Sequence, residues 1–104
     1  MENEQDKTMC LGKLERCYNT IQQFKTRVDS YMYEPTTITL FETKSYLKNK
    51  ITKLSESNKK LLEFMKATKD LLPEQYKLVD YHIRETFELE FDFMEYTTKF
   101  RQSV

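Results

Sequence analysis

The chain has 104 residues, which is enough for one domain with a modest hydrophobic core but too few for two independently stable units. Its 17 basic residues balance 17 acidic ones, so the overall charge gives no attraction to nucleic acid or to an anionic membrane. No apolar run approaches the roughly 20 residues of a membrane-spanning helix, and the polar first residues do not resemble a signal peptide, so we expect an intracellular protein that does not act at a membrane.

Helix-breaking residues are rare and evenly placed. Pro35 and Pro73 are the only prolines, Gly12 is the only glycine, and the segments between them are patterned apolar at helical spacing. We predict an all-α fold with a single domain over residues 1–104, an antiparallel three-helix bundle with long helices and coiled-coil-like packing. The expected helices cover about residues 5–33, 39–70 and 73–101. The alternative is a long, open coiled coil in which Pro73 bends the chain instead of reversing it.

The first predicted helix has two adjacent apolar stripes and should end near Tyr33, because Pro35 disfavours helical geometry in the residue before it. One stripe is Leu11, Leu14, Tyr18, Ile21, Val28 and Met32, and the other is Cys10, Cys17, Phe24 and Tyr31. A face this wide is typical of a helix with neighbours on two sides. Two turns, about 10.5 Å, separate Cys10 from Cys17, which excludes a disulfide between them within an intact helix. We expect buried free thiols; the alternative is pairing across a dimer interface.

The second predicted helix opens at Thr39, where Glu42 three residues later completes a capping-box pattern. Its apolar residues follow a heptad seam: Leu40, Leu47, Ile51, Leu54, Leu61, Met65 and Leu72. Asn58 is a polar residue on this seam, and a polar core residue can fix helix register or partner number. Asn58 is therefore a candidate for setting specificity; the alternative is that it lies at the solvated edge of the core.

The third predicted helix begins at Pro73, where a missing N–H costs nothing, and runs to about Arg101. Residues 87–93 alternate strictly between apolar and acidic side chains, which is typical of a strand. Helix is favoured, because a lone strand would leave its backbone unpaired. Two apolar lines follow from a helix: Tyr76, Val79, Ile83, Phe87, Phe91 and Met94 on one face, and Leu78, Leu89, Phe93, Tyr96 and Phe100 on the other.

A helix that is apolar on two faces has more apolar surface than one bundle core requires. Either it lies between the other two helices, or one of its faces is free for another chain. We take Leu89, Phe93, Tyr96 and Phe100, together with Asn58, as candidate partner-binding residues. The alternative is that these aromatic residues fill the core of the domain itself. The expected partner is another protein or a second copy of the chain.

Charge is divided between the second and third helices. Eight lysines lie between Lys44 and Lys69, and an acidic block without any basic residue follows in the third helix: Glu85, Glu88, Glu90, Asp92 and Glu95. We interpret this division as ion pairing between neighbouring antiparallel helices. The alternative function is nucleic-acid binding through the lysine-rich helix, which its lack of arginine disfavours.

Residues for catalysis are scarce. His82 is the only histidine, the two cysteines do not form a Cys-x-x-Cys motif, and one glycine cannot build a phosphate-binding loop. We expect a half-exposed His82, no enzymatic activity, no cofactor, no metal and no small-molecule substrate.

Three features recur along the run from Leu11 to Phe100. A leucine-rich first helix ends in a stretch from Arg27 to Tyr31, regularly spaced leucines precede Asn58, and Arg84, Phe87 and Glu88 match an Arg-x-x-Phe-Glu motif with an aromatic ending. In these features the chain resembles the helical N-terminal gag region of BEL/Pao-type retrotransposons. The resemblance implies a structural, self-associating role without catalysis. The zinc-knuckle cysteines of such polyproteins are absent here, so nucleic-acid packaging is not implied.

Overall fold

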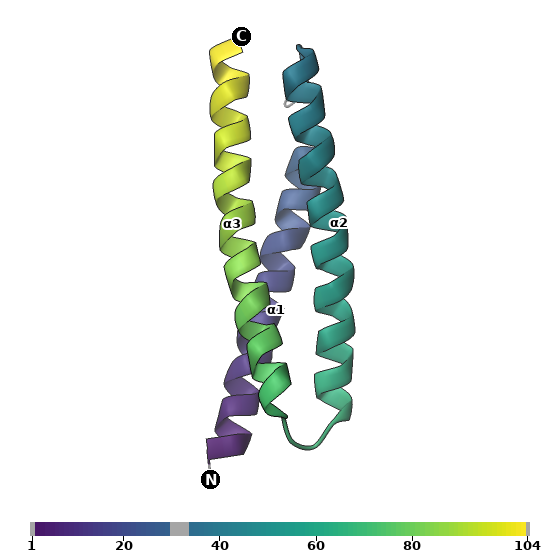
Figure 1. Cartoon of the computed structure of the whole chain (residues 1–104), viewed down its shortest axis with the longest axis vertical. Helices are drawn as coiled ribbons and strands as arrows, with labels where there is room; N and C mark the ends of the chain where they lie inside the picture. Colours follow the sequence, from purple (N-terminus) through teal and green to yellow (C-terminus); the bar gives the residue numbers. More distant parts are fainter. Residues whose placement is uncertain (1, 30–33, 104) are drawn as a thin grey trace.

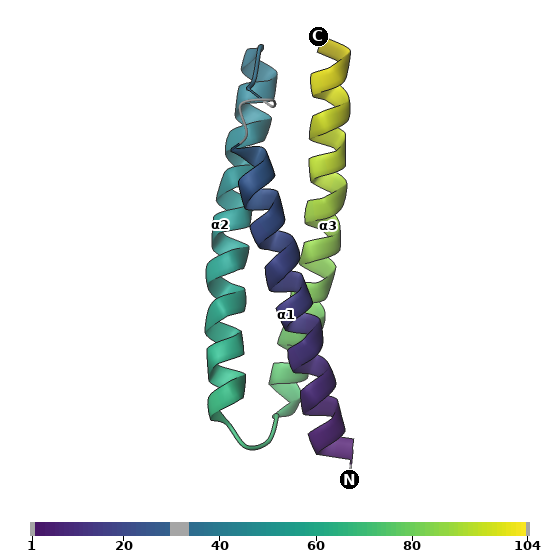
Figure 2. The ribbon, with the colours of Figure 1, turned by 180° about the vertical axis from the view of Figure 1, so that it is seen from behind.

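The computed structural model of the chain is a bundle of three long helices, α1 (Glu2–Val28), α2 (Ile38–Ala67) and α3 (Pro73–Ser103). It describes the backbone of residues 2–29 and 34–103, and within these the side chains of 7–29, 34–99 and 101. The helices α1 and α3 run in the same direction and α2 runs opposite to both (Figure 1). Each helix packs against the other two, in a rod of 55 × 18 × 18 Å (Figure 2). The predicted all-α three-helix bundle is confirmed, and the open coiled coil is wrong.

Residues 87–93 lie within α3, so the helical interpretation of this alternating stretch is confirmed. Pro73 is the first residue of α3, where it has no intrahelical hydrogen bond to lose. The N–H of Leu72 donates to Oε1 of Gln75 at 2.7 Å, which satisfies one of the free donors at the start of the helix. The chain therefore reverses between α2 and α3 over the short segment 68–72.

The start of α2 differs from the prediction. Thr37, with extended backbone angles, is the N-cap, and its Oγ1 accepts a hydrogen bond from the N–H of Leu40 at 3.1 Å. Thr39 is already inside the first turn, where its carbonyl accepts from the hydroxyl of Thr43. The predicted capping box at Thr39 is wrong, because the helix begins at Ile38 and Thr37 already caps it.

The other helix ends fall close to the predicted ones. The α2 helix ends at Ala67, because Thr68 adopts an extended conformation while its N–H donates to the carbonyl of Phe64. In α1 the described helix ends at Val28, and the predicted end near Tyr33 lies outside the described residues.

Two hydrophobic clusters form the core. The first, in the half that contains the end of α1 and the start of α2, is Ile21, Phe24, Val28, Leu40, Leu47, Ile51, Leu54, Leu89, Phe93 and Tyr96. The second, in the other half, is Leu14, Leu61, Leu62, Met65 and Val79, with Cys10, Leu11, Tyr18, Leu71 and Ile83 packed against it. Every helix contributes to both clusters, so neither half of the bundle is held by one helix pair alone. Cys17 is buried and Cys10 is half-buried.

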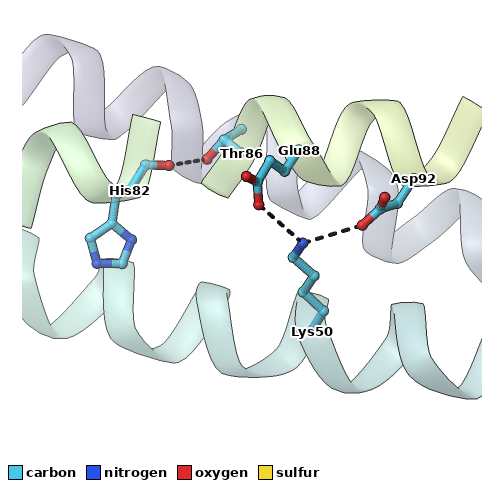
Figure 3. Close-up of polar contacts among 5 residues, drawn as sticks. All are labelled: Lys50, His82, Thr86, Glu88 and Asp92. Atoms are coloured by element: carbon cyan, nitrogen blue, oxygen red, sulfur yellow. Dashed lines mark hydrogen bonds and ion pairs between the residues drawn. The ribbon is translucent and has the colours of Figure 1, made fainter. Parts of the chain in front are cut away.

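The predicted pairing between lysines of α2 and the acidic block of α3 is found, among the described residues, at Lys50. Lys50 lies 3.2 Å from Oδ2 of Asp92 and 3.9 Å from Oε2 of Glu88, both on α3 (Figure 3). Burial alone would lower the pKa of Lys50, but the hydrogen bond and the charge of Asp92 outweigh it, so the pKa is raised. Lys48 pairs with Asp29, the residue that follows α1, and Lys66 pairs with Glu15 of α1. These last two pairs are half-exposed and add little stability.

Phe93 is central to the first cluster. Its ring centroid lies 5.1 Å from that of Phe24 and 6.5 Å from that of Tyr96, and the guanidinium carbon of Arg27 lies 4.8 Å from its ring. Aromatic pairs in this range add to the energy of burial itself. Phe93 therefore joins α1 to α3 in this half of the bundle.

Phe93→Ala should lower the free energy of unfolding by about 3–5 kcal/mol, because it removes a buried ring and leaves a cavity. The matched control is Phe91→Ala, the same change at an exposed position on the same helix, which should alter the free energy by about 0.5 kcal/mol or less. Urea unfolding followed by circular dichroism measures both. Equal losses for the two variants would contradict this assignment of the faces of α3.

Candidate functional site

The predicted partner-binding row on α3 is not a surface. Leu89, Phe93 and Tyr96 are at most 2% exposed and belong to the core, so the prediction that they face another chain is wrong. Burial also raises the pKa of the Tyr96 phenol, with a smaller contribution from the charge of Glu34. The side chain of Phe100, the fourth predicted member, lies outside the described residues.

A continuous seam at alternating spacings of three and four explains this burial. Its members are Gln75, Val79, His82, Thr86, Leu89, Phe93 and Tyr96, and all are buried. Three of the seven are polar, so a search for apolar residues alone does not find the seam. The unbroken alternation of four- and three-residue spacings is the feature of the sequence that indicates this seam.

The exposed face of α3 is instead formed by Phe87, Phe91 and Met94, which we call the outer row. Each of these side chains is 65% exposed. Their spacing of four and three residues places them on one stripe of the helix, about two turns long. They belong to the apolar line that also contains Val79, which is buried, and Tyr76 and Ile83, which are half-buried. An exposed apolar face on α3, expected from the sequence, therefore exists. It is formed by the outer row and not by the predicted row of Leu89, Phe93 and Tyr96.

A groove between α1 and α3 lies beside the Phe87 end of the outer row. It has a volume of about 320 Å³ and its lining includes Lys13, Arg16 and Cys17 of α1 and Ile83, Phe87 and Glu90 of α3. Phe91 and Met94 lie outside this groove. Of the three residues of the outer row, Phe87 therefore borders this groove.

A buried polar layer lies between the two hydrophobic clusters. Asn58 of α2 and His82 and Thr86 of α3 are 0%, 2% and 4% exposed. Along each helix they fall between residues of the two clusters: Asn58 between Leu54 and Leu61, and His82 and Thr86 between Val79 and Leu89. We call Asn58, His82 and Thr86 the polar layer. The prediction that His82 is half-exposed is wrong, as is the alternative of Asn58 at a solvated edge.

The polar layer is only partly hydrogen-bonded. Nε2 of His82 lies 3.3 Å from Oγ of Ser57, and the imidazole points toward α2 (Figure 3). The hydroxyl of Thr86 donates to the carbonyl of His82 at 2.7 Å. Among the described residues, no partner is found for Nδ1 of His82 or for either amide atom of Asn58. Buried polar atoms without partners cost stability, so the centre of the bundle is its least favourable layer.

Within the described residues, this layer does not form a triad of serine, histidine and a third orienting group. A serine activated by histidine needs a third group that orients the ring through its other nitrogen. In the part of the chain that the structure describes, that nitrogen of His82 has no such partner. Likewise, the described residues contain no group of three His, Cys, Asp or Glu side chains that could hold a metal ion.

Comparison with protein-family models, with curated proteins and with solved structures finds no match for the chain. Within the described residues, no helix is both long and apolar enough to cross a membrane.

Asn58→Leu should raise the free energy of unfolding by about 1–3 kcal/mol, because it removes a buried amide without partners and leucine has the same branching. The control is Asn49→Leu on the exposed side of the same helix, which should change the free energy by about 0.5 kcal/mol or less. Urea unfolding provides both values. A large loss of stability in Asn58→Leu would show that the amide is well bonded in solution.

Stability should fall as the pH drops below about 6.5. Burial lowers the pKa of His82 from its ordinary value, so the unfolded chain binds a proton that the folded chain does not. The resulting stability is fully present above about pH 6.5, the unfolded pKa, and is lost as the pH falls toward the folded pKa, with a slope of at most about 1.4 kcal/mol per pH unit.

His82 is the only histidine of the chain, so His82→Leu should remove this slope. The measurement is the free energy of unfolding at several values between about pH 7.5 and pH 5 for both proteins. The same slope in the variant would assign the pH dependence to other groups.

Proposed function

We propose that the chain is a non-enzymatic helical module that associates with another protein through the outer row of α3. The observation that carries the proposal is the exposure of Phe87, Phe91 and Met94 side by side on one helix face. Full burial of a large apolar side chain is worth about 1.5–3 kcal/mol. Three such side chains can therefore supply a substantial part of the binding energy for a partner, whereas their burial is not needed for the core.

A structural role as a scaffold fits this association. The bundle is a rod with helices of 27 to 31 residues, and its outer row runs along the rod axis. The resemblance to the BEL/Pao gag region implies a role of the same general class. We place the protein inside the cell, where a thiol such as that of the buried Cys17 would stay reduced.

Nucleic-acid binding is less well supported. Among the lysines of the basic stretch, Lys48, Lys50 and Lys66 are already paired with acids of the neighbouring helices. Phosphate binding would have to compete with these pairs, and the chain as a whole carries no net positive charge.

The double variant Phe87→Ser and Phe91→Ser should lower partner association at least tenfold, because it removes most of the apolar surface of the outer row. Proximity labelling by the full chain in its own cells, quantified by mass spectrometry, measures the association. Urea unfolding should show that the variant keeps the stability of the wild type within about 1 kcal/mol, since both side chains are exposed.

The matched control is Phe41→Ser with Tyr46→Ser, which removes two exposed aromatic residues from α2. This control should label the same proteins as the wild type. An equal loss in both double variants, or no loss in either, would contradict a specific role of the outer row.

A further inference from the structure

The outer row lies within an acidic segment of α3 that has no basic residue. Between Arg84 and Lys99 the α3 sequence contains five acids and no basic residue. Glu88 and Glu95 lie three residues before and four residues after Phe91, and Glu90 lies three residues after Phe87, so all three flank the outer row on the helix surface. Any partner that covers the outer row must therefore approach these carboxylates.

Two of these acids are not engaged in an ion pair within the described part of the chain. Lys50 neutralises Asp92 and lies 3.9 Å from Glu88, on the side of α3 that faces α2. Glu90 and Glu95 have no ion-pair or hydrogen-bond partner among the described residues. Lys13 and Arg16 of α1 line the groove at the Phe87 end of the outer row, but Phe91 and Met94 lie outside that groove. The carboxylates of Glu90 and Glu95 therefore remain available to a partner, although Glu90 shares the groove with Lys13 and Arg16.

This charge argues against a second copy of the chain as the partner. If the outer rows of two copies packed against each other, the two base-free segments 85–95 would face one another, acid against acid. Like charges brought together in an interface cost several-fold or more in affinity and suppress the wrong partner. A partner with positive charge beside its apolar residues gains from the same groups.

We infer that the outer row binds an amphipathic helix of another protein, with apolar side chains spaced to meet Phe87, Phe91 and Met94 and with Lys or Arg flanking them. This inference rests on the proposed function, because it names the partner of the same surface. Packing a helix along α3 suits a row about two turns long, where anchors at three- and four-residue spacing can meet its three side chains. The apolar contacts supply affinity, and the carboxylates of Glu90 and Glu95 select the sign of the partner's charge.

The test uses two synthetic helical peptides of about 20 residues, with the same leucine stripe and with either lysine or glutamate at every flanking position. Fluorescence anisotropy measures their binding to the full chain at low and high salt. The lysine peptide should bind at least tenfold more tightly than the glutamate peptide, and its affinity should fall as the salt concentration rises. Phe91→Ser should abolish its binding.

Charge variants separate the specific acids from the general charge of the protein. Glu90→Gln with Glu95→Gln should weaken the lysine peptide at least fivefold. Glu56→Gln with Glu63→Gln removes the same total charge from exposed sites on α2 and should leave the affinity within twofold. Equal effects of the two pairs would overturn the inference, because the binding would then follow net charge alone.

Other outcomes separate the inference from the proposed function. If both peptides bind equally and Phe91→Ser abolishes both, the outer row is a docking surface but the partner chemistry is wrong. If neither peptide binds and sedimentation shows a dimer that Phe91→Ser dissociates, the partner is a second copy, which overturns the inference and leaves the proposed function standing. If neither peptide binds and no assembly depends on Phe91, the inference is overturned, and the labelling experiment decides the proposed function separately.

Discussion

The rest of the structure depends on how α3 is turned about its own axis. This helix has apolar side chains on two faces, close to half a turn apart, and only one of them can face α1 and α2. The observed orientation buries Leu89, Phe93 and Tyr96 with Phe24 as a close aromatic neighbour of Phe93. It leaves Phe87, Phe91 and Met94 outside. The orientation of α3 therefore determines both the core and the candidate docking surface.

This orientation lowers stability in the middle of the bundle. The seam that buries the aromatic residues also carries His82 and Thr86 inward, opposite Asn58, and several of these polar atoms lack partners among the described residues. Because Ser57 contacts His82, Asn58 and His82 lie at the same level. A slip of α3 by one heptad would put Asn58 beside Leu89 in one direction, or His82 beside Ile51 in the other. The polar layer thus lowers stability while it penalises the wrong registers, a role known for buried polar residues in coiled coils.

Much of the fold could be predicted from the sequence, because the signals there are local. The prolines at 35 and 73, the heptad leucines of α2 and the absence of a second strand candidate together indicate three helices and a helical 87–93. The faces of α3 could not be assigned in this way. Counting apolar residues places Phe87 and Phe91 on a core line and ignores Gln75, His82 and Thr86, although these three continue the buried seam. Likewise, Thr37 and Thr39 are equally good caps by residue type, so residue type alone does not predict that Thr37 caps the helix.

Hydroxyl-radical footprinting of the free chain tests the orientation of α3 most directly, because it reports the solvent exposure of each side chain in solution. If α3 has the observed orientation, Phe87, Phe91 and Met94 should be oxidised at rates close to those of the unfolded chain. On the same helix, Phe93 and Tyr96 should be protected at least tenfold. Fast oxidation of Phe93 and Tyr96 with protection of Phe87 and Phe91 would contradict it, since the core and the docking surface would then have to be exchanged.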